Sequence, residues 1–135
     1  GVGEFFVDIR GVRQDDKARL VEDFKQAMAS RCAARGLDLK VETTVDEAPV
    51  PCTPWLIEGL DGLCREIGAD HVIMPSGAGH DTQHIAAAAD VGMLFIPSAR
   101  GIAHTPDEYT APEDVAYGAE VLTEALLRLA DNGLR

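Results

Sequence analysis

Two short apolar runs, at residues 71–74 and 92–96, constrain the fold of this 135-residue chain most strongly. Such runs are typical of strands that are buried on both faces, as in a parallel sheet covered by helices. Helical patterns precede, separate and follow the two runs, at residues 54–67, 81–89 and 112–130. Residues 51–135 are therefore predicted to form an α/β unit with the order α-β-α-β-α, parallel strands and short connections.

The first 50 residues predict a smaller unit with the order β-α-β. Residues 4–10 alternate apolar and polar side chains, which indicates a strand. Residues 14–34 carry apolar side chains at helical spacing, which indicates an amphipathic helix that ends at Gly36. Residues 37–45 alternate again and predict a second strand.

The two parts differ in charge and are joined by a proline-rich stretch. Residues 1–50 hold 8 Lys and Arg against 10 Asp and Glu, whereas residues 51–135 hold 4 against 13. Pro49, Pro51 and Pro54 exclude a continuous helix between the parts. We therefore expect a linker at residues 48–53 that joins two units, residues 1–50 and residues 51–135.

Each part has too few strands to form a covered sheet. Two buried parallel strands cannot shield three amphipathic helices, because a parallel sheet needs neighbouring strands and helices on both faces. Either the two parts share one sheet, or another polypeptide supplies the missing strands. The charge difference and the proline-rich linker favour the second alternative.

The composition limits the classes of partner. The formal net charge is −11, whereas a nucleic acid or an anionic membrane needs clustered positive charge on its partner, so neither is expected. No apolar run approaches the ~20 residues of a membrane span, and a signal-peptide pattern is not seen. Cys32, Cys52 and Cys64 form no CxxC pair and are interpreted as reduced structural thiols of a cytoplasmic protein.

A glycine-rich loop at residues 75–80 follows the first apolar run, where α/β folds place their sites. Gly77 and Gly79 allow a ligand to approach the backbone closely, and a helix entered at Asp81 favours a carboxylate or a phosphate. The spacing matches neither a dinucleotide-binding fingerprint nor a phosphate-binding loop with lysine. An anion site and a plain glycine-rich turn both remain open, and His80 leads directly from this loop.

His104 lies in a second polar loop, at residues 98–111. With Asp107 and Glu108 nearby, it offers the histidine and carboxylate ligands of zinc, manganese and related ions. One histidine does not make a metal site, so the remaining ligands would come from elsewhere. The alternative is an ordinary surface histidine.

Arg10 ends the first predicted strand, beside Gly11. Its guanidinium is suited to bind a carboxylate through two parallel hydrogen bonds. The alternative is a surface ion pair with Asp8 or another acidic residue. His71 and His84 are interpreted as structural.

Three motifs together resemble one enzyme family. They are V-D-I-R at residues 7–10, S-G-A-G-H-D at residues 76–81 and G-I-A-H-T-P-D-E at residues 101–108. They resemble the C-terminal part of the amidase, hydantoinase/carbamoylase family, which includes N-carbamoyl-L-amino-acid hydrolases, allantoate amidohydrolases and β-ureidopropionase-like enzymes. The resemblance implies that residues 1–50 are part of a lid or dimerisation domain of a homodimer. It implies that residues 51–135 are the C-terminal part of a zinc-peptidase-like catalytic α/β domain.

The same resemblance implies roles for four residues. His104 matches a metal-ligand histidine, Arg10 matches the arginine that holds the substrate carboxylate, and Gly79 and His80 match the loop that contacts the substrate. The other ligands of two divalent metal ions (zinc, manganese, cobalt or nickel) are expected upstream. So is the glutamate that serves as general base, and no catalytic residue is therefore assigned in this chain.

The implied activity is hydrolysis of a C–N bond in an N-carbamoyl (ureido) amino acid or allantoate by water that the metals activate. The chain alone is predicted to be inactive. Ala103 and Thr82 stand where the family usually has Ser and Ala, which leaves the substrate open. One alternative is a related metallopeptidase or deacylase. Another is a non-catalytic domain that binds a small anion or a partner chain.

Overall fold

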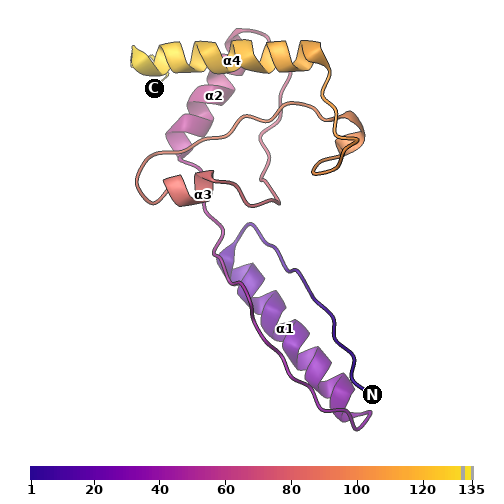
Figure 1. Ribbon diagram of the computed structural model, residues 1–135. Coiled ribbons are helices and arrows are strands. Elements are labelled where there is room, and N and C mark those ends of the chain that lie inside the picture. Colours follow the sequence, from indigo (N-terminus) through magenta and orange to yellow (C-terminus); the bar gives the residue numbers. More distant parts are fainter. Residues whose placement is uncertain (132, 135) are drawn as a thin grey trace. The chain divides into compact units, whose positions relative to one another are not determined.

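A computed structural model describes residues 1–131 and 133–134 (Figure 1). In this part of the chain the helices, in order, are α1 (Gln14–Ala33), α2 (Pro54–Glu66), α3 (Thr82–Ile85), the 3₁₀ turn η1 (Ala99–Gly101) and α4 (Pro112–Ala130). The three long helices begin at the predicted residues and end within one residue of the predicted positions. None of the described helices is long and apolar enough to cross a membrane.

Two glycines end α1 and α2 in the same way. Gly36 and Gly68 adopt the left-handed conformation, with φ of 64° and 73°. The next residue then donates its N–H back to the helix, from Leu37 to the Cys32 carbonyl at 3.0 Å and from Ala69 to the Cys64 carbonyl at 2.8 Å. This arrangement satisfies carbonyls that the helix end leaves free, and it confirms the predicted helix ends.

Thr53 directly precedes α2, but its hydroxyl does not cap the helix. Thr53 Oγ1 instead accepts the N–H of Val91 at 2.9 Å, and the Thr53 N–H donates to the Val91 carbonyl at 2.8 Å. The indole N–H of Trp55 donates to Asp90 at 3.1 Å. The start of α2 therefore anchors the segment that leads into the second apolar run.

None of the described residues is hydrogen bonded as a β-strand. The four predicted strands, at residues 4–10, 37–45, 71–74 and 92–96, run as non-helical chain, so the predicted α/β layout is not confirmed. A strand forms only where a neighbouring strand accepts and donates its backbone hydrogen bonds. Of the predicted β-α-β and α-β-α-β-α orders, the described residues show the helices and not the strands.

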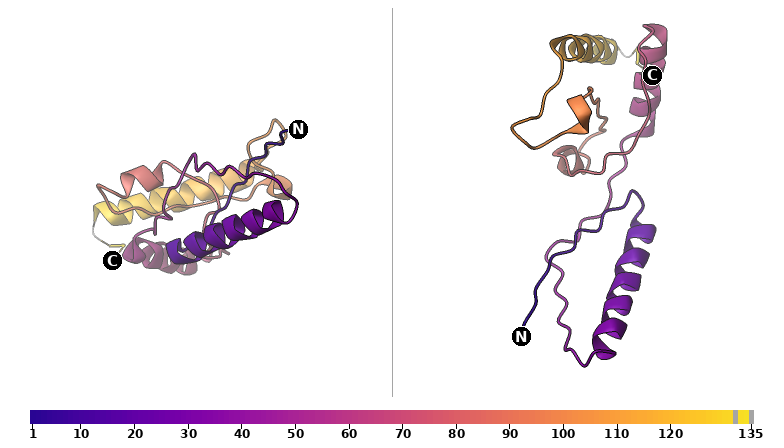
Figure 2. Two further views of the ribbon diagram at one scale, coloured as in Figure 1. Left: turned by 90° about the horizontal axis from the view of Figure 1, so that it is seen from below. Right: turned by 90° about the vertical axis from the view of Figure 1, so that its right-hand side faces the viewer.

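The chain divides into two compact units, and the first consists of Gly1–Pro51 and Pro75–Gly79. Non-helical runs lie beside α1 on either side of it in sequence (Figures 1 and 2). Lys17 is the one buried side chain among the described residues of this unit. Its Nζ donates to Asp46 Oδ1 at 2.7 Å and to the Glu47 carbonyl at 2.6 Å. A polar clasp therefore ties α1 to the run that follows it.

The second unit consists of Cys52–Met74 and His80–Arg135 and contains the hydrophobic core. Leu63 of α2 and Ala125 of α4 are each only 2% exposed. The other core members are Leu56, Cys64, Ala69, Val121 and Leu134. Arg128 of α4 donates to both carboxylate oxygens of Glu66 of α2, at 2.6 and 3.0 Å, and this ion pair lowers the pKa of Glu66. Apolar packing and a bidentate ion pair thus join α2 to α4.

Candidate functional site

The four predicted site residues divide between the two units. Arg10 and Gly79 belong to the first unit, whereas His80 and His104 belong to the second. Their surroundings are therefore described unit by unit.

Arg10 forms an ion pair with Asp8. Its Nε lies 3.2 and 3.0 Å from the two carboxylate oxygens of Asp8, and its Nη2 lies 2.7 Å from Oδ2. The hydrogen bonds and the charge of the guanidinium hold the pKa of Asp8 below its ordinary value. Both side chains are more than half exposed, at 61% and 67%. The structure therefore shows the surface ion pair with Asp8 that was one of the two alternatives for Arg10. Arg10 also makes a second contact.

This second contact is to the glycine-rich loop. Arg10 Nη1 donates to the Gly77 carbonyl at 2.9 Å, across 67 positions of sequence. Within the loop, the Ala78 N–H donates to Ser76 Oγ at 3.1 Å. A side chain at Gly77 would have open space around it. The V-D-I-R and S-G-A-G-H-D motifs, far apart in sequence, thus meet inside the first unit.

The helix that follows this loop is shorter than predicted. α3 spans four residues instead of residues 81–89, and none of its side chains is buried, so packing does not extend it. The His80 N–H, at its entrance, donates to Gln83 Oε1 at 3.2 Å. A helix of four residues adds little dipole at this loop, and the anion site and the plain glycine-rich turn both stay predictions.

His80 packs its ring against Phe95. The two ring centroids lie 5.6 Å apart at an interplanar angle of 60°, an edge-to-face arrangement. Phe95 belongs to the second apolar run, at residues 92–96. The second unit therefore places the His80 imidazole beside the segment that leads into the His104 loop.

His104 has an exposed side chain and an unusual backbone. Its φ is 59°, as is that of Arg100, and a non-glycine residue in this region costs on the order of 1 kcal/mol or more. Its N–H donates to Glu108 Oε2 at 2.7 Å, and the Ala99 N–H donates to the Tyr109 carbonyl at 2.8 Å. These contacts close the loop and hold the left-handed turn at His104.

The described residues do not form a metal site by themselves. In residues 1–131 and 133–134, no group of three or more His, Cys, Asp or Glu side chains is arranged to hold a metal ion. Glu108 directs its carboxylate to the backbone of His104. A catalytic zinc site uses three protein ligands. His104 therefore fits a metal only as one ligand among others from outside the described residues.

His71, interpreted from the sequence as structural, lies between two polar acceptors. Its Nδ1 lies 2.8 Å from the Ala69 carbonyl, and its Nε2 lies 2.9 Å from Asp61 Oδ1. Both partners are acceptors, so both ring nitrogens donate only when the imidazole is protonated. The hydrogen bonds to Ala69 and Asp61 raise the pKa of His71. Asp61 also pairs with Arg65 at 2.8 Å, an i, i+4 spacing that the sequence contains.

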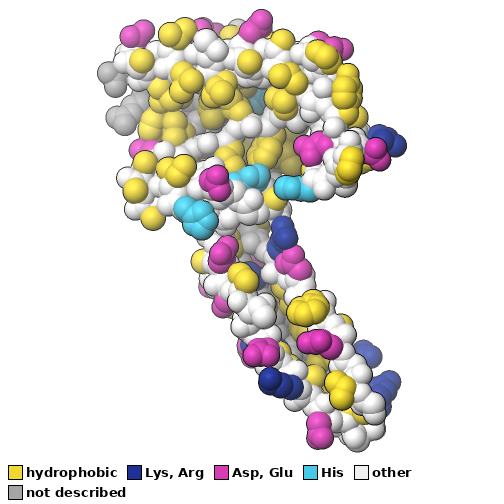
Figure 3. Space-filling model, in the orientation of Figure 1, with side chains coloured by type: hydrophobic (Ala, Val, Ile, Leu, Met, Phe, Trp, Pro, Cys, Tyr) yellow, Lys and Arg dark blue, Asp and Glu magenta, His cyan; other side chains and the backbone are white. Residues whose placement is uncertain are grey.

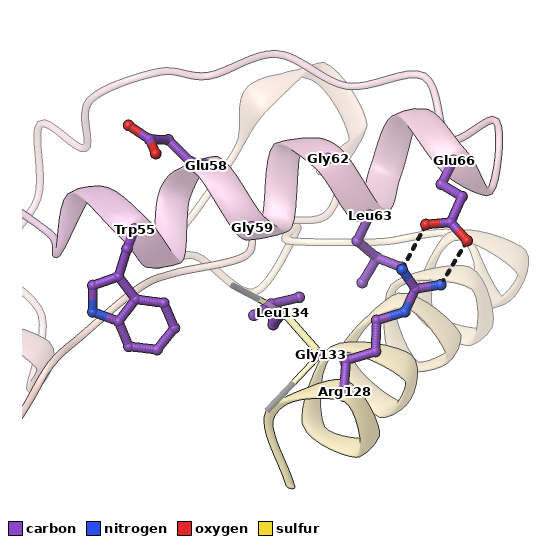
Figure 4. A pocket seen from close by; sticks show the side chains of 9 residues that line it. All are labelled: Trp55, Glu58, Gly59, Gly62, Leu63, Glu66, Arg128, Gly133 and Leu134. Atoms are coloured by element: carbon purple, nitrogen blue, oxygen red, sulfur yellow. Dashed lines mark hydrogen bonds and ion pairs between the residues drawn. The ribbon is translucent and has the colours of Figure 1, made fainter. Parts of the chain in front are cut away.

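A cavity of about 690 Å³ lies between α2, α4 and the described residues near the C-terminus (Figure 4). It is lined by Trp55, Glu58, Gly59, Gly62, Leu63, Glu66, Arg128, Gly133 and Leu134. Leu134 lies directly against Gly59, where a side chain would collide with it. The guanidinium of Arg128 is occupied by Glu66 and Glu124. None of the predicted site residues lines this cavity.

Comparison with known proteins confirms the family resemblance. Residues 3–128 match the model of Peptidase family M20/M25/M40. An N-carbamoyl-L-amino-acid amidohydrolase of Pseudomonas sp. is 32% identical over 93% of this chain and 30% of that protein. The N-carbamoyl-L-amino acid amidohydrolase of Geobacillus stearothermophilus is 34% identical over 94% and 31%. The allantoate amidohydrolase of Escherichia coli is 36% identical over 84% and 28%. The chain thus spans about a third of the length of these curated relatives.

Proposed function

Because the chain belongs to peptidase family M20/M25/M40, we propose that it is the C-terminal part of a metal-dependent amidohydrolase. The reaction is hydrolysis of a C–N bond in a ureido group of a small substrate that carries a carboxylate, such as an N-carbamoyl amino acid or allantoate. The observation that carries the proposal is the identity of 32–36% to relatives with these activities in their names, over 84–94% of the chain. Family membership also supports a zinc-peptidase-like fold.

Arg10 binds the substrate carboxylate in this proposal. A guanidinium has five N–H donors. Asp8 and Gly77 accept from Nε, Nη1 and Nη2, which leaves one N–H on each terminal nitrogen. Two such donors match the two oxygens of a carboxylate. Gly79 and His80 contact the remainder of the substrate.

His104 is one ligand of a two-metal site whose other ligands come from outside this chain. Family M20 peptidases are generally metal-dependent, which supports this role. Divalent ions such as zinc, manganese, cobalt or nickel, when bound, supply Lewis-acid polarisation of the scissile group. The left-handed turn held by Glu108 fixes the direction in which the His104 side chain leaves the loop. No residue of this chain serves as the general base.

The two units take different parts in the whole protein. The first, around α1, is part of a lid or dimerisation domain of a homodimer, and the second is the C-terminal part of the catalytic domain. The coverage of about 30% of each relative supports an enzyme that extends beyond this chain. The cysteine pattern supports a cytoplasmic enzyme; all three thiols are free.

The test is carried out on the full-length protein that contains this chain. We expect it to hydrolyse N-carbamoyl amino acids or allantoate, and His104→Ala to lower both metal content and kcat/KM, the latter by about 100-fold or more. His84→Ala, which replaces an exposed histidine of α3, is the matched control. Full metal content and full activity in His104→Ala would refute the role of His104.

A related peptidase or deacylase is the second candidate, because the family takes its name from peptidases. Dipeptides and N-acyl amino acids assayed beside the ureido substrates distinguish the two. A preference for dipeptides or N-acyl compounds would replace the ureido assignment.

A further inference from the structure

The carboxylate of Asp8 and the carbonyl of Gly77 hold the guanidinium of Arg10 from two directions. Asp8 makes three contacts of 2.7 to 3.2 Å with the Nε and Nη2 side of the fork. Gly77 accepts from Nη1 at 2.9 Å. All three residues lie in the first unit. This hydrogen bond joins the glycine-rich loop to the segment that carries Arg10.

The spacing of Asp8 and Arg10 is part of this arrangement. In extended chain, side chains two positions apart point to the same side. An acidic residue at position 8 is therefore the nearest charged neighbour that can lie alongside the Arg10 side chain. An arginine without such a neighbour samples many rotamers, and ordering it on binding weakens the affinity for a ligand.

The geometry points to Asp8 as a positioning residue that fixes the orientation of Arg10 and, through Arg10, the loop Pro75–Gly79. This inference rests on the proposed role of Arg10 in binding the substrate carboxylate. Asp8 does not itself contact the substrate. It engages one edge of the guanidinium and leaves one N–H on each terminal nitrogen directed elsewhere.

The opposite possibility is that Asp8 competes with the substrate for Arg10. A competitor would occupy the donors that the substrate needs. The donors left free after Asp8 and Gly77 are bound are a separate pair, one on Nη1 and one on Nη2. A substrate carboxylate therefore has two N–H donors available while Asp8 remains in place, and this count of donors favours positioning over competition.

Asp8→Asn in the full-length protein tests this. The amide removes the charge and leaves a single acceptor oxygen, so Arg10 and the loop lose their order. For an exposed ion pair we expect KM for the ureido substrate to rise about threefold to fivefold, with kcat within about twofold of wild type. Millisecond hydrogen exchange of the amides at residues 76–79 is expected to accelerate by a similar factor.

Two variants control for charge and fold. Asp16→Asn removes another carboxylate of the same unit that is more than half exposed, and this one pairs with Arg13 and Arg19. It should change neither KM nor loop exchange. Asp8→Glu restores the carboxylate and should return KM to within about twofold of wild type.

The outcomes separate the two proposals. Loop exchange in Asp8→Asn equal to that in Asp16→Asn would overturn the positioning role, and so would a lower KM, which is the mark of a competitor. The exchange measurement needs no substrate. If the wild-type protein hydrolyses none of the compounds, the proposed function fails, and loop exchange alone still decides the role of Asp8.

Discussion

The contacts inside the first unit differ in kind from the contacts inside the second. In the second unit, α2 and α4 bury leucine, valine and alanine side chains against each other. In the first unit, the one described buried side chain is Lys17, and α1 leaves Leu20 53% exposed. Both units contain an amphipathic helix that ends at a left-handed glycine, Gly36 in the first unit and Gly68 in the second. Helical periodicity therefore produces a helix in either unit, whereas a core requires a second apolar face within the same unit.

The total exposed surface shows how much of the chain is left uncovered. The chain exposes 10713 Å², whereas two separate compact units of these sizes would expose about 8,000 Å². Large apolar side chains contribute in both units, as Figure 3 shows on one face. In the first unit, Phe5 is 62% and Phe6 is 87% exposed. Exposed apolar surface of this extent is ordinarily covered by another part of the polypeptide or by a partner.

The largest contrast between the units is expected when one leucine is shortened in each. Leu63→Ala, at a position 2% exposed, is expected to lower the free energy of unfolding by about 2–5 kcal/mol. Leu20→Ala makes the same change at an exposed position of α1 and should cost less than about 0.5 kcal/mol. Urea unfolding followed by far-ultraviolet circular dichroism measures both. Equal losses would show that both leucines lie in a core.

A smaller effect is expected at the polar clasp of the first unit. Lys17→Met keeps the buried stem but removes the bonds to Asp46 and Glu47, and should lower the free energy of unfolding by about 1 kcal/mol. Lys25→Met removes an exposed pair with Glu22 and is the control, with an expected change below about 0.5 kcal/mol. If both variants unfold alike, the clasp contributes no more than a surface ion pair.

The smallest effect is a pH dependence of opposite sign in the two units. Lys17 lowers the pKa of Asp46, so this clasp stabilises the first unit above pH 3.8 and is lost as the pH falls through the lowered value. The pKa of His71 is raised, so its contacts stabilise the second unit below pH 6.5 and are lost as the pH rises through the raised value.

The unfolding free energies of Asp46→Asn and His71→Gln, compared with wild type across pH, test these signs. The difference for Asp46→Asn should shrink in acid. The difference for His71→Gln should shrink in alkali. If the difference in unfolding free energy between a variant and wild type stays constant with pH, the titration of the replaced residue does not cause the pH dependence of stability.

The sequence predicted those parts of the fold that depend on local spacing. Helix bounds follow from periodicity, from Pro54 and Pro112 at helix starts and from Gly36 and Gly68 at helix ends. The predicted strands depend on neighbours that local sequence does not supply, and they are not formed in the described residues. The helix predicted at residues 81–89 is longer than the observed α3. The alanines at residues 86–89 favour a helix, but their small side chains bury little apolar surface to stabilise it.

In the candidate site, too, contacts between residues close in sequence could be predicted and contacts between distant residues could not. The ion pair between Asp8 and Arg10 was an alternative in the sequence, because the two residues are two positions apart in an extended segment. The bond from Arg10 to Gly77 spans 67 positions and carries no local signal. The left-handed backbone of His104 was also not predicted, because a non-glycine residue adopts this conformation uncommonly and neither adjacent residue is a glycine.

The loop Pro75–Gly79 belongs to the first unit although its flanking residues belong to the second. The polypeptide therefore passes from one unit to the other three times, after Pro51, Met74 and Gly79. Neither unit is a continuous stretch of the gene, so expressing residues 1–51 alone would omit the Gly77 acceptor of Arg10. A protease that cuts once, between residues 48 and 53, would leave that bond joining two separate fragments.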